Sequence, residues 1–129
     1  MYRPQLVEGL LPDLRPELLK FLEHSCDGWL FRADLGYSGH YLVAHHPPRT
    51  TLILPVPKLY KLEVDKLVKA IYNREEHRLD LGRSQALDYV PDYPTVVNLK
   101  IWTDDMLLPI TLDFPLCREL IDALYRMTA

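Results

Sequence analysis

The stretch that decides the fold is residues 50–72, TTLILPVPKLYKLEVDKLVKAIY. It opens with a run of β-branched and apolar residues, Thr50 to Leu54, that ends at two prolines, as is typical of a short strand. Beyond the prolines, apolar residues recur at helical spacing, namely Val64, Leu67, Val68, Ile71 and Tyr72. The stretch therefore predicts a strand, a proline-containing corner and an amphipathic helix.

Upstream of this unit, the sequence predicts a helix and a β-hairpin. The helix runs from about Asp13 to about Asp27 and carries one apolar stripe. Two short β-prone runs follow, Trp29–Ala33 and His40–Ala44, with two glycines between them. This pattern predicts two antiparallel strands joined by a longer hairpin loop.

Downstream, the periodic pattern is lost between Asn73 and Pro94, where charged residues, glycine, serine and proline predominate. A connection of this length is unusual in a compact domain, so it is either a functional loop or it holds a short element around Ala86 and Leu87. We expect the segment Arg74–Asp92 to open locally in the free protein and to be cut early by protease near Arg83. Its apolar residues are expected to dock when a partner binds: Leu79, Leu81, Leu87 and Tyr89.

The end of the chain predicts two more strands and a helix. The strands are Thr95–Trp102 and Met106–Leu112, and Asp113 is expected to cap the helix. The whole order is then α-β-β-β-α-β-β-α, which indicates a single α+β domain over residues 1–129. We expect two layers, with a mostly antiparallel sheet of about five strands and three helices.

Composition narrows the class of function. The chain has 129 residues, of which 48% are hydrophobic and 26% are charged, as in ordinary globular domains. Its net charge of −3 argues against a nucleic-acid partner, because phosphate backbones bind basic surfaces. The sequence has no uninterrupted apolar run of the length that a signal peptide or a membrane span needs, so we expect a cytoplasmic protein. Cys26 and Cys117 are interpreted as small buried side chains rather than as a disulfide.

Three histidines are the first candidates for chemistry. His40, His45 and His46 lie close together in the sequence and could bind zinc. Strand alternation, however, places His40 and His46 on one face and His45 on the other. We therefore expect no metal. No catalytic or ligand-binding motif of any specificity is present in the sequence, so we also expect no cofactor and no catalytic residue. The alternative is a small enzyme or metal-binding protein whose site combines these histidines and Tyr41 with the Tyr- and Asp-rich part of the long connection, namely Asp80, Asp88, Tyr89, Asp92 and Tyr93.

The predicted strands carry apolar side chains on both faces. If the helices cover one face, the other face leaves large side chains uncovered: Leu30, Leu42, Ile53, Val96, Trp102 and Leu107. Such a patch favours binding to a protein partner or to a second copy of the chain, as in a homodimer. The alternative is that a helix or the long connection folds across this face. The favoured function is a non-catalytic protein-binding module, namely a small chaperone, adaptor or inhibitor.

The order of elements resembles the class I chaperones of type III secretion systems. The segment Val64–Asn73 is similar to their central helix. Asp104 and Asp105, followed by Leu107–Leu112 and a closing helix, are similar to their final hairpin and helix. The resemblance implies a cytosolic homodimer whose sheets hold an extended segment of a client protein, without catalysis.

Overall fold

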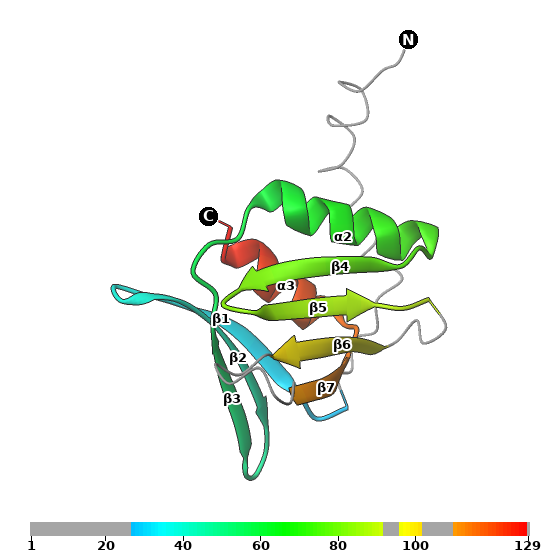
Figure 1. Ribbon diagram of the computed structural model, residues 1–129. Helices are drawn as coiled ribbons and strands as arrows, with labels where there is room; N and C mark the ends of the chain where they lie inside the picture. The colour runs from blue at the N-terminus through cyan, green and yellow to red at the C-terminus, as the bar shows by residue number, and fades with distance from the viewer. Residues whose placement is uncertain (1–26, 92–95, 102–109, 129) are drawn as a thin grey trace.

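The structure is a computed structural model, and it describes residues 27–91, 96–101 and 110–128 (Figure 1). Its strands are β1 (Leu30–Gly36), β2 (Gly39–His46), β3 (Thr50–Pro55), β4 (His77–Gly82), β5 (Gln85–Tyr89), β6 (Val96–Ile101) and β7 (Ile110–Pro115). Its helices are α2 (Lys61–Asn73) and α3 (Arg118–Arg126). The α+β class and the antiparallel pairing are confirmed. The predicted first helix lies outside the described residues, apart from Asp27, which belongs to a turn.

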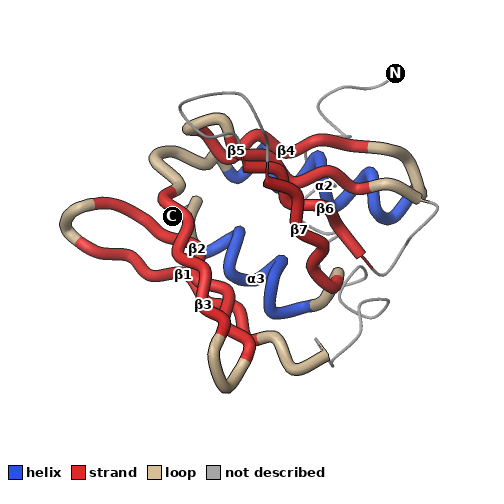
Figure 2. Tube along the Cα trace, turned by 60° about the horizontal axis from the view of Figure 1, so that its bottom comes forward, coloured by secondary structure: helices blue, strands red, loops and turns tan. Residues whose placement is uncertain are grey.

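The strands form two sheets, so the prediction of one sheet of about five strands is wrong. One sheet has the order β1-β2-β3 and the other has the order β4-β5-β6-β7. Figure 2 shows α3 between the two sheets, and α2 lies against β4. The helices are therefore not collected on one face of one sheet. Instead, the two sheets share a core with α3.

Helix α2 forms where the sequence predicts it. Val64, Leu67 and Val68 are buried on one stripe, as their spacing requires. Tyr72, which was expected to belong to this stripe, is instead exposed. The helix ends at Arg74, which takes a left-handed conformation and donates its backbone N–H to the carbonyl groups of the last turn.

The connection after α2 is a β-hairpin. The alternative that it holds a short element around Ala86 and Leu87 is confirmed by β5, and the alternative of an irregular functional loop is wrong. In β4, Leu79 and Leu81 are buried, and the intervening Asp80 is exposed, which is the period of a half-buried strand. Arg83 and Ser84 form the turn, and both have positive φ values. Two-residue hairpin turns of this kind usually contain Asn-Gly. Because Arg83-Ser84 is not such a pair, the sequence does not indicate the turn.

The apolar residues of this hairpin belong to the core and not to a partner-binding loop. Leu79, Leu81, Leu87 and Tyr89 are all fully or almost fully buried. They line the face of the four-stranded sheet that packs against the helices. The hairpin is therefore part of the core, and the premise that these residues wait in a loop for a partner is wrong.

The last helix starts later than the sequence predicts. Strand β7 continues through Asp113 to Pro115, because its backbone pairs with β6, and Asp113 lies opposite Asn98. Helix α3 then begins at Arg118, after the N-cap residue Cys117. Apolar residues spaced at helical intervals through this segment predict one buried stripe, and all of them are buried, although Leu116 precedes α3 and Met127 follows its last residue: Leu116, Leu120, Ala123, Leu124 and Met127.

An aromatic cluster joins the two sheets. Phe114 of β7 packs edge-on against Trp29 and Phe31, with ring centroids 4.9 Å and 5.5 Å apart. Trp29 directly precedes β1, and Phe31 is the second residue of this strand. The contact holds β1 against β7 without a ladder of backbone hydrogen bonds, since the two strands belong to different sheets.

Candidate functional site

The predicted partner-binding residues do not share one face. The side chains of Leu30 and Ile53 are 53% and 61% exposed, as expected for uncovered apolar groups. Leu42 is 1% exposed, so its assignment to the patch is wrong. Trp102 and Leu107 lie outside the described residues, and for Val96 only the backbone of β6 is described.

The strand register explains why Leu42 is buried. Leu42 lies opposite Ala33 of β1 and Leu54 of β3. The side chains of these three cross-strand neighbours face the core. Leu30 lies opposite His45, so it belongs to the other face. We call that other face the outer face, and it is formed by Leu30, Arg32, Asp34, Tyr41, Val43, His45, Thr51, Ile53 and Pro55. The sequence alone does not give this register, because a shift of one residue exchanges the two faces.

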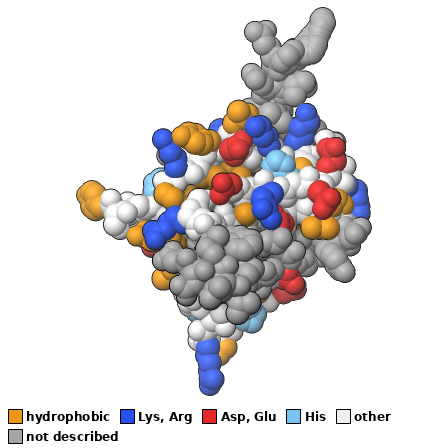
Figure 3. All heavy atoms as spheres, in the orientation of Figure 1, with side chains coloured by type: hydrophobic (Ala, Val, Ile, Leu, Met, Phe, Trp, Pro, Cys, Tyr) orange, Lys and Arg blue, Asp and Glu red, His pale blue; other side chains and the backbone are white. Residues whose placement is uncertain are grey.

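The outer face combines apolar side chains with one pair of charges. Val43 lies at its centre between Arg32 and Ile53 and is buried. Arg32 and Asp34 are both exposed and both come from β1. Beyond this face, the β1–β2 hairpin projects from the body (Figure 1) and carries the fully exposed Tyr37. Figure 3 shows hydrophobic side chains at this projection, and acidic and basic side chains interspersed over the part of the body that is turned to the viewer.

A groove of about 240 Å³ runs between β1 and α3. Its lining comprises Phe31, Arg32 and Ala33 from β1 and Glu119, Asp122, Ala123 and Arg126 from α3. Phe31 and Ala123 are buried, whereas Glu119 and Arg126 are exposed at the rim. The groove therefore has an apolar floor and a charged rim, and it lies along the edge of the three-stranded sheet.

The three histidines have separate partners. His40 Nδ1 lies 3.3 Å from the carbonyl oxygen of Met127, and His45 Nδ1 lies 2.6 Å from Thr51 Oγ1. His46 Nε2 lies 3.1 Å from the carbonyl oxygen of Asp27. The predicted separation of His45 from the other two is confirmed by the strand register. Within the described part of the chain, no three His, Cys, Asp or Glu side chains are grouped so that they could hold a metal ion.

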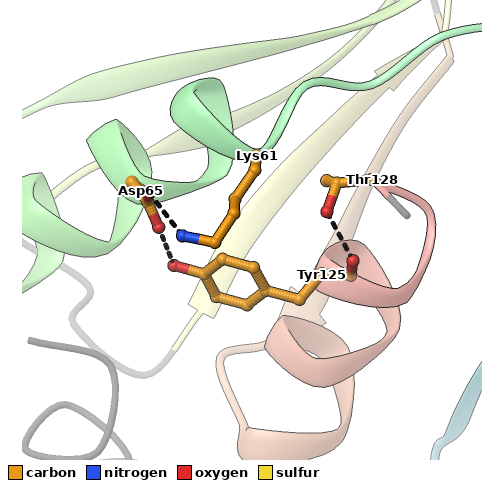
Figure 4. A network of polar contacts seen from close by, with 4 residues as sticks. All are labelled: Lys61, Asp65, Tyr125 and Thr128. Carbon is orange, nitrogen blue, oxygen red and sulfur yellow. Dashed lines mark hydrogen bonds and ion pairs between the residues drawn. The ribbon is translucent and has the colours of Figure 1, made fainter. Parts of the chain in front are cut away.

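The buried carboxylate of Asp65 joins α2 to α3 (Figure 4). Its side chain accepts a hydrogen bond of 2.5 Å from the hydroxyl of Tyr125 and one of 3.1 Å from Lys61 Nζ. Asp65 is 4% exposed, and each of its carboxylate oxygens has a donor. Sequence reasoning missed this residue because Lys61 and Asp65, four positions apart on a helix, look like an exposed pair. The arrangement is a satisfied structural contact between the helices.

The loop that the enzyme alternative requires is the β4–β5 hairpin of the other sheet. A shallow depression of about 330 Å³ lies there beside Arg78 and Asp88. Arg78 donates two hydrogen bonds to Asp88, at 2.7 Å and 3.1 Å, and Asp88 raises the pKa of Arg78. This carboxylate is engaged by a guanidinium group, so it is not poised as a general base. The hairpin and the three histidines thus form no common site among the residues described.

Cys117 is buried, as expected, but it is disulfide-bonded. The expectation that it is an unpaired small side chain is therefore wrong. The chain has one other cysteine, Cys26, which lies outside the described residues. A disulfide-bonded sulfur is not a nucleophilic thiolate, so the geometry gives no catalytic role to Cys117.

Comparisons of the chain with profiles of known protein families, with curated proteins and with solved structures found no match. Across the described ranges, no helix combines the length and the apolar character that crossing a bilayer requires.

Proposed function

We propose that the chain is a non-catalytic protein-binding module, a small chaperone, adaptor or inhibitor, that binds through the outer face of its three-stranded sheet. The observation that carries this proposal is the exposure of Leu30 and Ile53 on that face. Full burial of a large apolar side chain is worth about 1.5–3 kcal/mol. A partner that covers both residues would gain much of this free energy.

The polar side chains support binding rather than catalysis. The histidines, Asp65 and the Arg78–Asp88 pair are held by different contacts in different parts of the molecule. A catalytic site needs several such groups around one reacting atom. The proposed place of action is the cytoplasm, although the disulfide of Cys117 weighs against it because cytoplasmic thiols are usually kept reduced.

Site-specific photo-crosslinking in cells tests the proposed surface. A photoreactive residue replaces Thr51, which is exposed on the outer face, or Arg83, which is exposed in the β4–β5 turn. We expect a defined protein adduct from position 51 and none from position 83. The adduct should disappear in the double variant Leu30→Lys/Ile53→Lys, because lysine does not pack in an apolar interface.

The matched control is Leu62→Lys, which makes the same change at an exposed leucine of α2. This control should retain the adduct. The proposal is overturned if position 51 gives no adduct, or if the adduct survives Leu30→Lys/Ile53→Lys unchanged.

A further inference from the structure

The two edge strands of the three-stranded sheet differ in how well they can accept another strand. The Val56 N–H donates to the carbonyl of His40 at 2.9 Å, which fixes the phase of hydrogen bonding between β2 and β3. Alternation along the ladder then directs the backbone groups of Thr51, Ile53 and Pro55 away from β2. Pro55 has no N–H to donate, so the outer edge of β3 is interrupted.

The edge of β1 has no such interruption. By the same alternation, Tyr41, Val43 and His45 of β2 pair with β1, and the remaining β1 residues face outward. Phe31, Ala33 and Leu35 therefore direct their N–H and C=O groups to the outer edge. Within the described part of the chain, β1 pairs with β2 alone. An edge of this kind is a template for a further strand.

The charges beside this edge select one partner and one register. Arg32 and Asp34 flank Ala33 on the outer face. If a second β1 pairs antiparallel about a two-fold axis at Ala33, Arg32 lies opposite the partner's Asp34, and Asp34 lies opposite the partner's Arg32. Moving the axis to Arg32 or to Asp34 would place two like charges directly opposite each other, which is destabilising.

The inner side of the same pairing is apolar. An axis at Ala33 places Leu35, which is 49% exposed, opposite the partner's Phe31. Phe31 lines the groove between β1 and α3, so the partner's Leu35 would enter the mouth of that groove. The hydrogen-bonded pairs of this ladder are Phe31 with the partner's Leu35, Ala33 with the partner's Ala33, and Leu35 with the partner's Phe31. All of these residues direct their backbone groups outward, so the backbone permits the register that the charges select.

The rim of the groove follows the same symmetry. His40 lies opposite Leu35 in the sheet and contacts the carbonyl of Met127, so the C-terminal end of α3 is at the Leu35 end of β1. A two-fold axis at Ala33 reverses the second α3 relative to the first. Glu119 would thereby be brought toward the partner's Arg126, and Arg126 toward the partner's Glu119. Both side chains are exposed at the rim.

From these observations we infer that a second copy of the chain binds at β1, and that the two β1 strands pair antiparallel about Ala33 to make one continuous six-stranded sheet. The inference rests on the proposed function, because it names the partner of the same three-stranded sheet. It also enlarges the proposed binding surface, since the outer faces of two copies, each with Leu30 and Ile53, would become contiguous.

Charge reversal at β1 tests both the partner and the register. Sedimentation of the full-length wild type should show a dimer. Arg32→Asp and Asp34→Arg should each weaken dimerisation at least tenfold, because each variant places two like-charged pairs across the axis. The double variant Arg32→Asp/Asp34→Arg should restore it, and so should an equimolar mixture of the two single variants, which pair with each other and not with themselves.

The mixture also shows that both single variants are folded, since unfolded chains would not form the mixed dimer. Lys66→Asp, an exposed charge reversal on α2, is the matched control and should leave the dimer unchanged. A monomeric wild type, or a dimer insensitive to the changes at Arg32 and Asp34, overturns the inference. Either result leaves the proposed function standing if the adduct at position 51 still depends on Leu30 and Ile53.

Discussion

The contact between Asp65 and Tyr125 gives the most direct test of how the two helices are held together. Tyr125→Phe removes one hydroxyl and leaves the aromatic ring in place. The lost hydrogen bond is 2.5 Å long and ends on a carboxylate that is 4% exposed. Hydrogen bonds to charged groups contribute about 1.5–3 kcal/mol, and water has little access to replace this donor. Lys61 remains to neutralise the charge, so we expect a loss of about 2 kcal/mol in the free energy of unfolding.

Urea unfolding followed by circular dichroism measures this loss as a shift of the midpoint at constant slope. Unfolding entropy is about 2.1 cal/mol/K per residue, so for 129 residues a loss of about 2 kcal/mol in the free energy of unfolding lowers the Tm by about 7 °C. Tyr37→Phe is the control, because it makes the same chemical change at a fully exposed side chain. If the two variants lose equal stability, the reasoning is refuted. A double-mutant cycle with Asp65→Ala should show that most of the effect of Tyr125→Phe requires Asp65.

Two further predictions concern the β4–β5 turn and the disulfide. Replacing Arg83 and Ser84 by Asn and Gly should raise the free energy of unfolding by about 1 kcal/mol, because both positions have positive φ. A lower urea midpoint for this variant would contradict the left-handed turn. Reducing the disulfide of Cys117 should lower the free energy of unfolding by about 2–4 kcal/mol, measured as the urea midpoint with and without reductant. An unchanged midpoint would show that the bond does not restrain the unfolded chain.

The local patterns of the sequence were sufficient for some elements. Helix α2 and the buried stripe of α3 follow from apolar spacing, which acts within a single helix and needs no knowledge of its neighbours. The β4–β5 hairpin shows where such reasoning fails. Leu79 and Leu81 do alternate with charged residues, but the pattern is short, and the turn at Arg83 and Ser84 lacks the residues that usually mark a tight hairpin.

The candidate site could be predicted only in part. Exposed Leu30 and Ile53 follow from the abundance of apolar residues on both faces of the predicted strands. Alternation alone also predicts Leu42 for this patch, whereas in the structure Leu42 and its neighbours Ala33 and Leu54 face the core. The hydrogen bond between Tyr125 and Asp65 joins residues that are 60 positions apart in the sequence, so no local pattern predicts it.

The sequence by itself determined the α+β class, the positions of α2 and of the first three strands, and the opposite orientation of His45 relative to His40 and His46. These properties depend on the repeat of the helix and on the alternation of the strand, which are fixed by neighbouring residues. Only the tertiary structure decided the division into two sheets, the strand register and, among the described strands, the position of β1 at an edge of its sheet. Each of these depends on which strands meet across the molecule. A shift of register by one residue preserves the local alternation of a strand but exchanges its two faces, so the local sequence does not choose between registers. The packing of side chains that are distant in the sequence, such as Trp29 and Phe114, makes that choice.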